Sequence, residues 1–176
     1  MQGRSSAYPE GVLDVSILIP VCFENPLKEY SIAFLSEVLT QRKRVALPVS
    51  SIMGAYHITT RYLRVPKIPV KKVLEGILRS ESPALYPHIT PKIALDGLDY
   101  AAVYDIESWD GYLVSLTRSL GATVVYSLDQ ELSRVKEIIV ANPFPQDKVK
   151  QYHEFIEAKL KYSYNDVIND HKKSLY

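Results

Sequence analysis

Three aspartates occupy positions from which a sheet protein could bring them together. Asp14 lies in a nearly all-aliphatic run, Asp110 falls at the head of a helical pattern, and Asp129 follows a β-rich run. An ionised carboxylate inside a buried strand is unfavourable unless positive charge or several donors compensate it, which singles out Asp14. Taken singly, Asp110 is also typical of a helix-start acid and Asp129 of a turn former. Together, the three predict an all-oxygen site of the kind that Mg²⁺ or Mn²⁺ prefers.

The elements that must position these acids alternate between strands and helices. Val12 to Ile19 predicts a buried parallel strand, because almost every residue in it is aliphatic. Further strands are expected over residues 45–49, 122–126 and 137–141, and helices over residues 26–41, 51–63, 70–79, 91–103 and 108–120. The fold class is therefore α/β, with a central parallel sheet flanked by helices in three layers. Ligands collect at the carboxyl ends of such strands, which is where Asp129 falls.

Capping residues mark several helix boundaries. Thr90 followed by Pro91 is a good N-cap and first-turn pair, and Ser50 or Ser51 is expected to cap the helix that follows the second strand. Ser108 is expected to cap the next acid-bearing helix, and Gly121 to end it. We expect the apolar stripe of that helix to consist of Trp109, Leu113, Leu116 and Leu120.

The chain changes character after Pro143 and Pro145. We assign residues 1–145 to the sheet domain and residues 146–176 to a C-terminal helical extension. Its apolar positions are Val149, Tyr152, Ile156, Leu160 and Val167. Two arrangements stay open for this helix: packing against its own domain, or pairing with a second copy in a homodimer, since the stripe is narrow and close to heptad spacing.

The composition indicates the class of protein and its expected cellular location. The chain has 176 residues, 47% hydrophobic and 23% charged, as is ordinary for a globular domain. The apolar run near the start contains Ser16 and Pro20 and is too short to span a bilayer, and no signal peptide is recognisable, so we expect no membrane association. The single cysteine, Cys22, excludes an internal disulfide and favours a cytoplasmic location.

The net charge of +1 conceals two regions of opposite sign. Residues 42–79 carry nine basic side chains against one acid, a net charge of +8, whereas residues 93–131 carry seven acids against one base, a net charge of −6. Two solvated helical faces would explain this arrangement, and so would a cation-binding pit beside a phosphate-binding surface. Other chemistries are not indicated, because the four histidines are scattered and there is no glycine-rich phosphate loop and no nucleophile elbow.

Three segments together resemble the PIN domain family, which includes the VapC-type toxins: "VLDVSIL", "SWDGYLVSLTRSLGATVVYSLDQEL" and "IIVANPF". The resemblance covers roughly Val12 to Phe144, and the second segment is its most specific part. It implies a parallel sheet flanked by helices and a metal-dependent endoribonuclease that leaves a 5′-phosphate and a 3′-hydroxyl. It also implies that Asp14, Asp110 and Asp129 are the catalytic metal ligands for Mg²⁺ or Mn²⁺.

The resemblance extends to supporting residues, with one departure. Ser16 and Ser127 fall where small hydroxyl residues are usual in the family. The family also supplies a glutamate near the start of the helix after the second strand, but "PVSSIMGAYHITTRYL" contains no acid. By the resemblance, that glutamate would fall at about Gly54. His57, one helical turn further on, or Glu24 could take its place as a metal ligand.

Two classes of function therefore stay open. The first is the endoribonuclease, as the toxin of a toxin–antitoxin pair with an antitoxin protein as partner, or as an RNA-processing enzyme. The second is a catalytically weakened PIN-like module that binds RNA or a protein. In both, the basic block would hold the RNA backbone, and Tyr56 and Tyr62 are candidates for stacking bases. The basic residues expected to contact RNA are Arg42, Lys43, Arg44, Arg61 and Arg64.

Overall fold

The computed structural model describes the backbone of residues 9–173 and the side chains of residues 9–161. The strands are β1 (Gly11–Leu13), β2 (Val45–Pro48), β3 (Leu85–Tyr86), β4 (Val124–Tyr126) and β5 (Ile139–Ala141). The α-helices are α1 (Val15–Leu18), α2 (Lys28–Leu39), α3 (Val49–His57), α4 (Lys67–Arg79), α5 (Pro91–Tyr104), α6 (Ser108–Ser119) and α7 (Gln146–Lys173). Two 3₁₀ helices, η1 (Ile19–Cys22) and η3 (Glu131–Arg134), and a π-helix, η2 (Ile58–Tyr62), complete the described elements.

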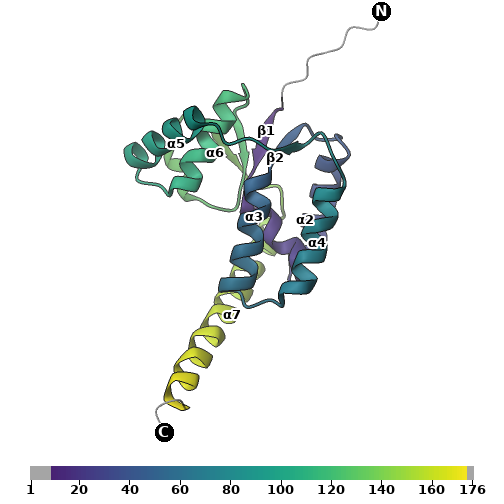
Figure 1. Cartoon of the computed structure of the whole chain (residues 1–176), viewed down its shortest axis with the longest axis vertical. Coiled ribbons are helices and arrows are strands. Elements are labelled where there is room, and N and C mark those ends of the chain that lie inside the picture. The colour runs from purple at the N-terminus through teal and green to yellow at the C-terminus, as the bar shows by residue number, and fades with distance from the viewer. Residues whose placement is uncertain (1–8, 174–176) are drawn as a thin grey trace, which may run out of the picture.

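The five strands form one parallel sheet in the order β3-β2-β1-β4-β5. The predicted α/β class, with a central parallel sheet flanked by helices and a further helix at the C-terminus, is confirmed (Figure 1). Along the chain the strands are added outward from β1 to β3 on one side and then from β4 to β5 on the other. The order therefore reverses between β1 and β4, and such a switch point opens a crevice at the carboxyl ends of the two strands.

The predicted first strand is wrong in its second half. β1 ends at Leu13, and Asp14 is the N-cap of α1 rather than a residue inside a strand. The aliphatic run fits both elements because α1 and η1 are themselves buried, and a short apolar run does not distinguish a buried strand from a buried helix. Asp14 consequently lies at the carboxyl end of β1, directly at the switch point.

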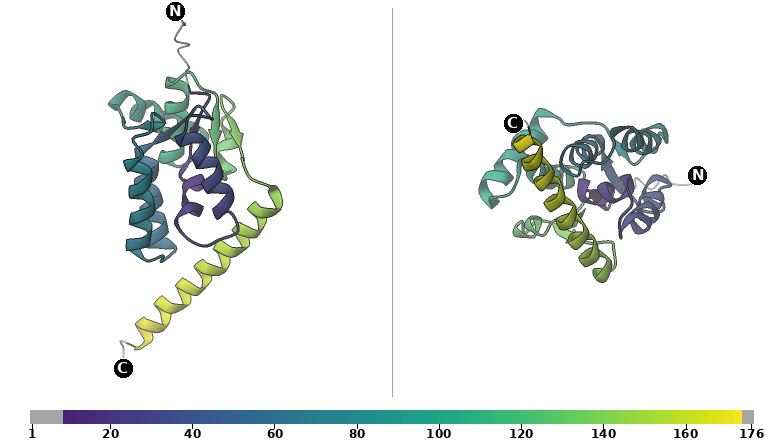
Figure 2. Two further views of the ribbon diagram at one scale, coloured as in Figure 1. Left: turned by 90° about the vertical axis from the view of Figure 1, so that its right-hand side faces the viewer. Right: turned by 90° about the horizontal axis from the view of Figure 1, so that it is seen from below.

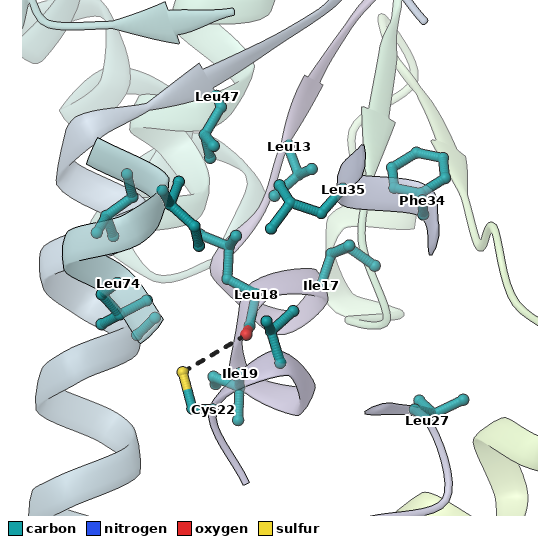
Figure 3. Close-up of a cluster of buried hydrophobic side chains, with 14 of the residues drawn as sticks. Leu13, Ile17, Leu18, Ile19, Cys22, Leu27, Phe34, Leu35, Leu47 and Leu74 are labelled. Atoms are coloured by element: carbon teal, nitrogen blue, oxygen red, sulfur yellow. Dashed lines mark hydrogen bonds between the residues drawn. The ribbon is translucent and has the colours of Figure 1, made fainter. Parts of the chain in front are cut away.

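Alternating residues of the strands feed two cores. Val12 and Ala46 pack against α5 and α6 on one face of the sheet, whereas Leu13 and Leu47 belong to the main core. That main core continues beyond the strands into the helices α1 to α4, as Figure 3 shows for Leu13, Leu18 and Leu47. The helices labelled α2, α3 and α4 in Figure 1 thus extend past the carboxyl edge of the sheet, while α5 and α6 lie to its side.

Helices α5 and α6 pack with their backbones in close contact. A Cβ atom placed on Gly111 would lie 2.1 Å from the carbonyl oxygen of Gly97, so no larger residue fits at this crossing. This contact fixes how α6 is rotated. Its buried residues run from Asp110 to Thr117, whereas Trp109 points outward and is 61% exposed. The expected stripe is therefore wrong at Trp109, and the N-cap residue is Glu107 rather than Ser108.

The first half of α7 packs back on the domain. Tyr152 is buried, and Val149 and Ile156 contact the main core, so this part of the helix belongs to the same hydrophobic cluster as the sheet domain. Farther along, Leu160 is largely exposed and the helix leads away from the body (Figures 1 and 2). The side chain of Val167 lies outside the described residues. Among the described helices, none is long and apolar enough to cross a membrane.

Candidate active site at the carboxyl ends of β1 and β4

Asp14 is held in place by the turn from β1 into α1. Its carboxylate accepts hydrogen bonds from the backbone N–H groups of Val15 (2.6 Å) and Ser16 (3.3 Å), and from the hydroxyls of Ser16 (2.5 Å) and Ser127 (2.7 Å). These donors favour the ionised form, but burial outweighs them and raises the pKa of Asp14 above its usual range. Because one oxygen accepts only the Val15 bond, the carboxylate retains capacity to bind a further group.

The two predicted serines tie the ends of β1 and β4 together. Ser16 accepts a hydrogen bond from Leu128 N at 3.0 Å, and Ser127 accepts one from Asp129 N at 2.9 Å. Each hydroxyl thus donates to Asp14 and accepts from the loop after β4. The two serines therefore fix the loop that carries Asp129 relative to Asp14.

Asp110 has a largely buried side chain whose carboxylate oxygens have no protein partner in the described part of the chain, although they are not fully shielded from solvent. It lies in the first turn of α6 and is only 8% exposed, and no described side chain or backbone group donates a hydrogen bond to it. Burial raises its pKa to about 7, and the negative charges of Asp14 and Asp129 contribute to this rise. Asp110 thus lies close enough to Asp14 and Asp129 for their charges to disfavour its ionised form.

Two more acids belong to the same electrostatic cluster. Glu107 and Glu131 also raise the pKa of Asp110. Glu131 donates its backbone N–H to Asp129 at 2.8 Å, which fixes the carboxylate of Asp129 at the start of η3. The sequence pattern did not single out these glutamates. Their signal was their placement close to the aspartates along the chain, Glu107 before Asp110 and Glu131 after Asp129.

The donor set fits a hard divalent cation in type and charge. All of its ligands are carboxylates, and among the described side chains no lysine, arginine or histidine forms an ion pair with Asp14, Asp110 or Asp129. A cation would neutralise such a cluster, as protonation of Asp110 also would. However, within the described part of the chain no three acidic, histidine or cysteine side chains are close enough to hold one ion together. Binding would therefore have to draw the carboxylates inward.

The helix that lacks the expected glutamate approaches the same cluster. A Cβ atom on Gly54 would lie at ordinary contact distance, 3.4 Å, from the Val15 side chain, next to Asp14. The substitutes do not join the cluster: His57 is exposed at the end of α3, packed edge-on against Tyr62, and Glu24 pairs with Lys28 in solvent. The face of α3 that meets the site is therefore uncharged.

The basic residues do not form one surface beside the acids. Residues 42–44 precede β2, and Arg44 accepts a backbone hydrogen bond from Glu10 just before β1, so this group lies at the amino ends of the strands. The acids lie at the opposite, carboxyl edge. Arg61 and Arg64 lie beyond the far end of α3, about 14 Å along that helix from the edge. These five residues therefore do not lie directly beside the acids, and a phosphate-binding surface next to the acidic site stays a prediction.

The tyrosines proposed for stacking are divided in the same way. Tyr56 packs against the main core, and Tyr62 is exposed but belongs to the distant end of α3. Neither lies at the carboxyl edge of the sheet.

The fold and the site together define a class: a parallel α/β protein with an acidic cluster at the topological switch point of its sheet. No protein-family model matches this chain, and no curated protein matches its sequence.

Proposed function

We propose that this chain is a metal-dependent endoribonuclease of PIN-domain type, in which Asp14, Asp110 and Asp129 hold Mg²⁺ or Mn²⁺. The observation that carries the proposal is the state of Asp110. Its side chain is only 8% exposed, it has no hydrogen-bond donor and no cationic partner among the described residues, and burial raises its pKa to about 7. A bound cation would compensate its charge. The resemblance to PIN domains, on the same three aspartates, supports RNA as the substrate.

Each residue of the site has a separate role in the proposed reaction. When bound, a divalent cation supplies Lewis-acid polarisation of a phosphodiester and lowers the pKa of water. Asp14 offers a carboxylate that its four donors orient and help to keep ionised. Burial raises the pKa of Asp110 to about 7, so its carboxyl group would have to lose its proton to help hold the cation. Ser16 and Ser127 hold the loop that carries Asp129 in a fixed position relative to Asp14.

The second candidate is a PIN-like module that has lost catalysis and binds RNA or a protein. The uncharged helix face at Gly54 and the absence of a preformed three-ligand group among the described residues favour it. An antitoxin partner, a homodimer and a cytoplasmic location stay predictions under either function.

Cleavage of a mixed single-stranded RNA pool in Mn²⁺ tests the nuclease. We expect cleavage that leaves 5′-phosphates and that EDTA and Asp110→Asn both abolish. Asp147→Asn is the matched control, because Asp147 is also a first-turn helix acid but is exposed on α7. Cleavage that survives Asp110→Asn, or no cleavage at all, would leave the binding module as the better account.

Restoring the missing acid separates the two candidates further. The space at Gly54 accepts a side chain, so Gly54→Glu should add a carboxylate beside Asp14 and tighten Mn²⁺ binding about tenfold, a gain of about 1.4 kcal/mol. Gly54→Gln, of equal size without charge, is the control. Isothermal titration with Mn²⁺ measures both, and equal affinities in the two variants would show that this face does not reach the ion.

A further inference from the structure

An exposed tryptophan directly precedes one of the clustered acids on α6. Trp109 directly precedes Asp110 on α6, and its ring packs edge-on against Tyr112, with centroids 6.1 Å apart at 86°. It is the single tryptophan of the chain, and its ring is mostly exposed although the interior of α6 is apolar. A large aromatic side chain left in water is unusual for a residue type that dominates cores and interfaces.

A row of aromatic rings, of which Tyr112 is buried and Tyr86 half-buried, continues from Trp109 along the edge of the sheet. Tyr112 packs in the same hydrophobic cluster as Tyr86, and Ser50 donates a hydrogen bond to its hydroxyl at 3.4 Å. Tyr86 ends β3 and meets the exposed His88 edge-on, with ring centroids 5.9 Å apart at 88°. These rings come from the first turns of α6 and from the carboxyl end of β3. They therefore lie on the same edge of the sheet as the acids.

The buried members of the row hold the exposed ones. Tyr112 is fixed by the core and by Ser50, so the ring of Trp109 contacts a rigid neighbour edge-on while the residue itself is mostly exposed. An exposed ring on a rigid support can receive a planar partner at little loss of conformational freedom. Every nucleobase has a planar face, whereas a base inside a duplex is already stacked on both sides.

We propose that Trp109 stacks on a base of single-stranded RNA adjacent to the phosphate handled at Asp110, and that Tyr86 and His88 continue this track along the carboxyl edge of the sheet. The inference rests on the proposed ribonuclease function and specifies its substrate as single-stranded. It also replaces Tyr56 and Tyr62 as the stacking residues. The position of Trp109 explains the preference, because a helical substrate cannot present an unstacked base to it.

The fluorescence of Trp109, the single tryptophan, reports directly on the binding of RNA beside it. In the cleavage-deficient Asp110→Asn protein with Mg²⁺, a single-stranded RNA oligonucleotide should quench the tryptophan fluorescence saturably, and the same sequence as a duplex should not. Affinity is measured separately by anisotropy of a labelled oligonucleotide. Trp109→Ala should weaken it about 5- to 150-fold, the range that one stacked base contributes. Trp109→Phe should recover most of the loss, and Tyr62→Ala, which removes an equally exposed ring far from the site, should change it less than about twofold.

The outcomes separate this inference from the function on which it rests. If the wild-type protein cleaves RNA and Trp109→Ala binds and cleaves single strands as the wild type does, the proposed stacking on Trp109 is wrong and the proposed nuclease function is retained. The track is equally overturned if duplex RNA binds as tightly and quenches as strongly as the single strand. If neither cleavage nor binding of single strands is found in any variant, both proposals fail.

Discussion

Replacing Asp110 by asparagine should make this protein more stable at neutral pH, although a buried carboxylate in a helix is lost. The expectation follows from the electrostatics of the site. Ionised Asp110 has no donor and no cation among the described residues, and it faces the charges of Asp14 and Asp129. The asparagine amide keeps the shape of the aspartate side chain and removes the charge. A residue kept for function at the expense of stability behaves in this way.

The magnitude follows from the shift in acidity. A pKa raised from 3.8 to about 7 corresponds to at most about 4 kcal/mol of unfavourable interaction in the ionised form. Solvent screening at the mouth of the cluster reduces this to about 2 kcal/mol. For a chain of 176 residues, such a gain raises Tm by about 4–8 °C.

The pH dependence gives the sign of the effect. Because the folded-state pKa of Asp110 is raised, the wild-type penalty is absent below the unfolded value of 3.8, grows as pH rises and is complete above about pH 7. The advantage of Asp110→Asn should therefore be near zero at about pH 4 and full at about pH 8. Urea unfolding at the two pH values, without metal, measures it.

Two controls make the result specific to the cluster. Asp147→Asn removes an exposed first-turn acid and should cost a few tenths of a kcal/mol at both pH values, through the helix dipole alone. Added Mg²⁺ should raise the Tm of the wild type and leave Asp110→Asn nearly unchanged. A loss of stability in Asp110→Asn at the higher pH, equal to that of Asp147→Asn, would refute the idea of an uncompensated carboxylate and make Asp110 an ordinary helix-start acid.

Two further substitutions probe the parts that position the site. Gly111→Ala should lower the free energy of unfolding by about 3 kcal/mol, because the added Cβ would meet the backbone of Gly97. As a control, Gly76→Ala has no atom within 4 Å of the added Cβ and should stabilise α4 by up to about 1 kcal/mol. Thermal unfolding that gives both effects the same sign would contradict the close packing of α5 on α6. Ser127→Ala removes a hydrogen-bond donor to a buried carboxylate and should lower the free energy of unfolding in urea by about 2 kcal/mol. The control, Ser119→Ala, changes an exposed serine and should lower it by less than about 0.5 kcal/mol. Equal losses would mean that the Ser127 hydroxyl does not hold the loop after β4.

The elements with local chemical signals were predictable from the sequence. Thr90 is the N-cap of α5 and accepts the Ile93 N–H at 3.3 Å, and Gly121 adopts the left-handed conformation (φ 69°) just after α6. Both signals depend on a few neighbouring residues. By contrast, β3 has two residues and no pattern long enough to detect, and the run after Leu13 suits a buried strand as well as a buried helix.

The acids were predictable as residues, but their environment was not. The order of elements along the chain places Asp129 at a strand end, whereas Asp14 was expected inside the first strand and lies at its end because β1 stops at Leu13. That Asp110 is buried while Trp109 faces solvent depends on the rotation of α6, which the contact of Gly111 with Gly97 decides. A helical pattern places both residues in the first turn and cannot rank their exposure without that contact.

The basic residues show the same limit on a larger scale. A net charge of +8 over residues 42–79 is a property of the sequence, yet it says nothing of which edge of the sheet each residue reaches. In a parallel sheet the loop before a strand and the loop after it lie at opposite edges, so residues 42–44, which precede β2, are separated by the whole sheet from Asp14, which follows β1. RNA bound at the acids would therefore have to be held by something other than residues 42–44. The aromatic row that begins at Trp109 lies on the correct edge, which is why stacking, rather than this part of the basic block, carries our account of how a single strand is held there.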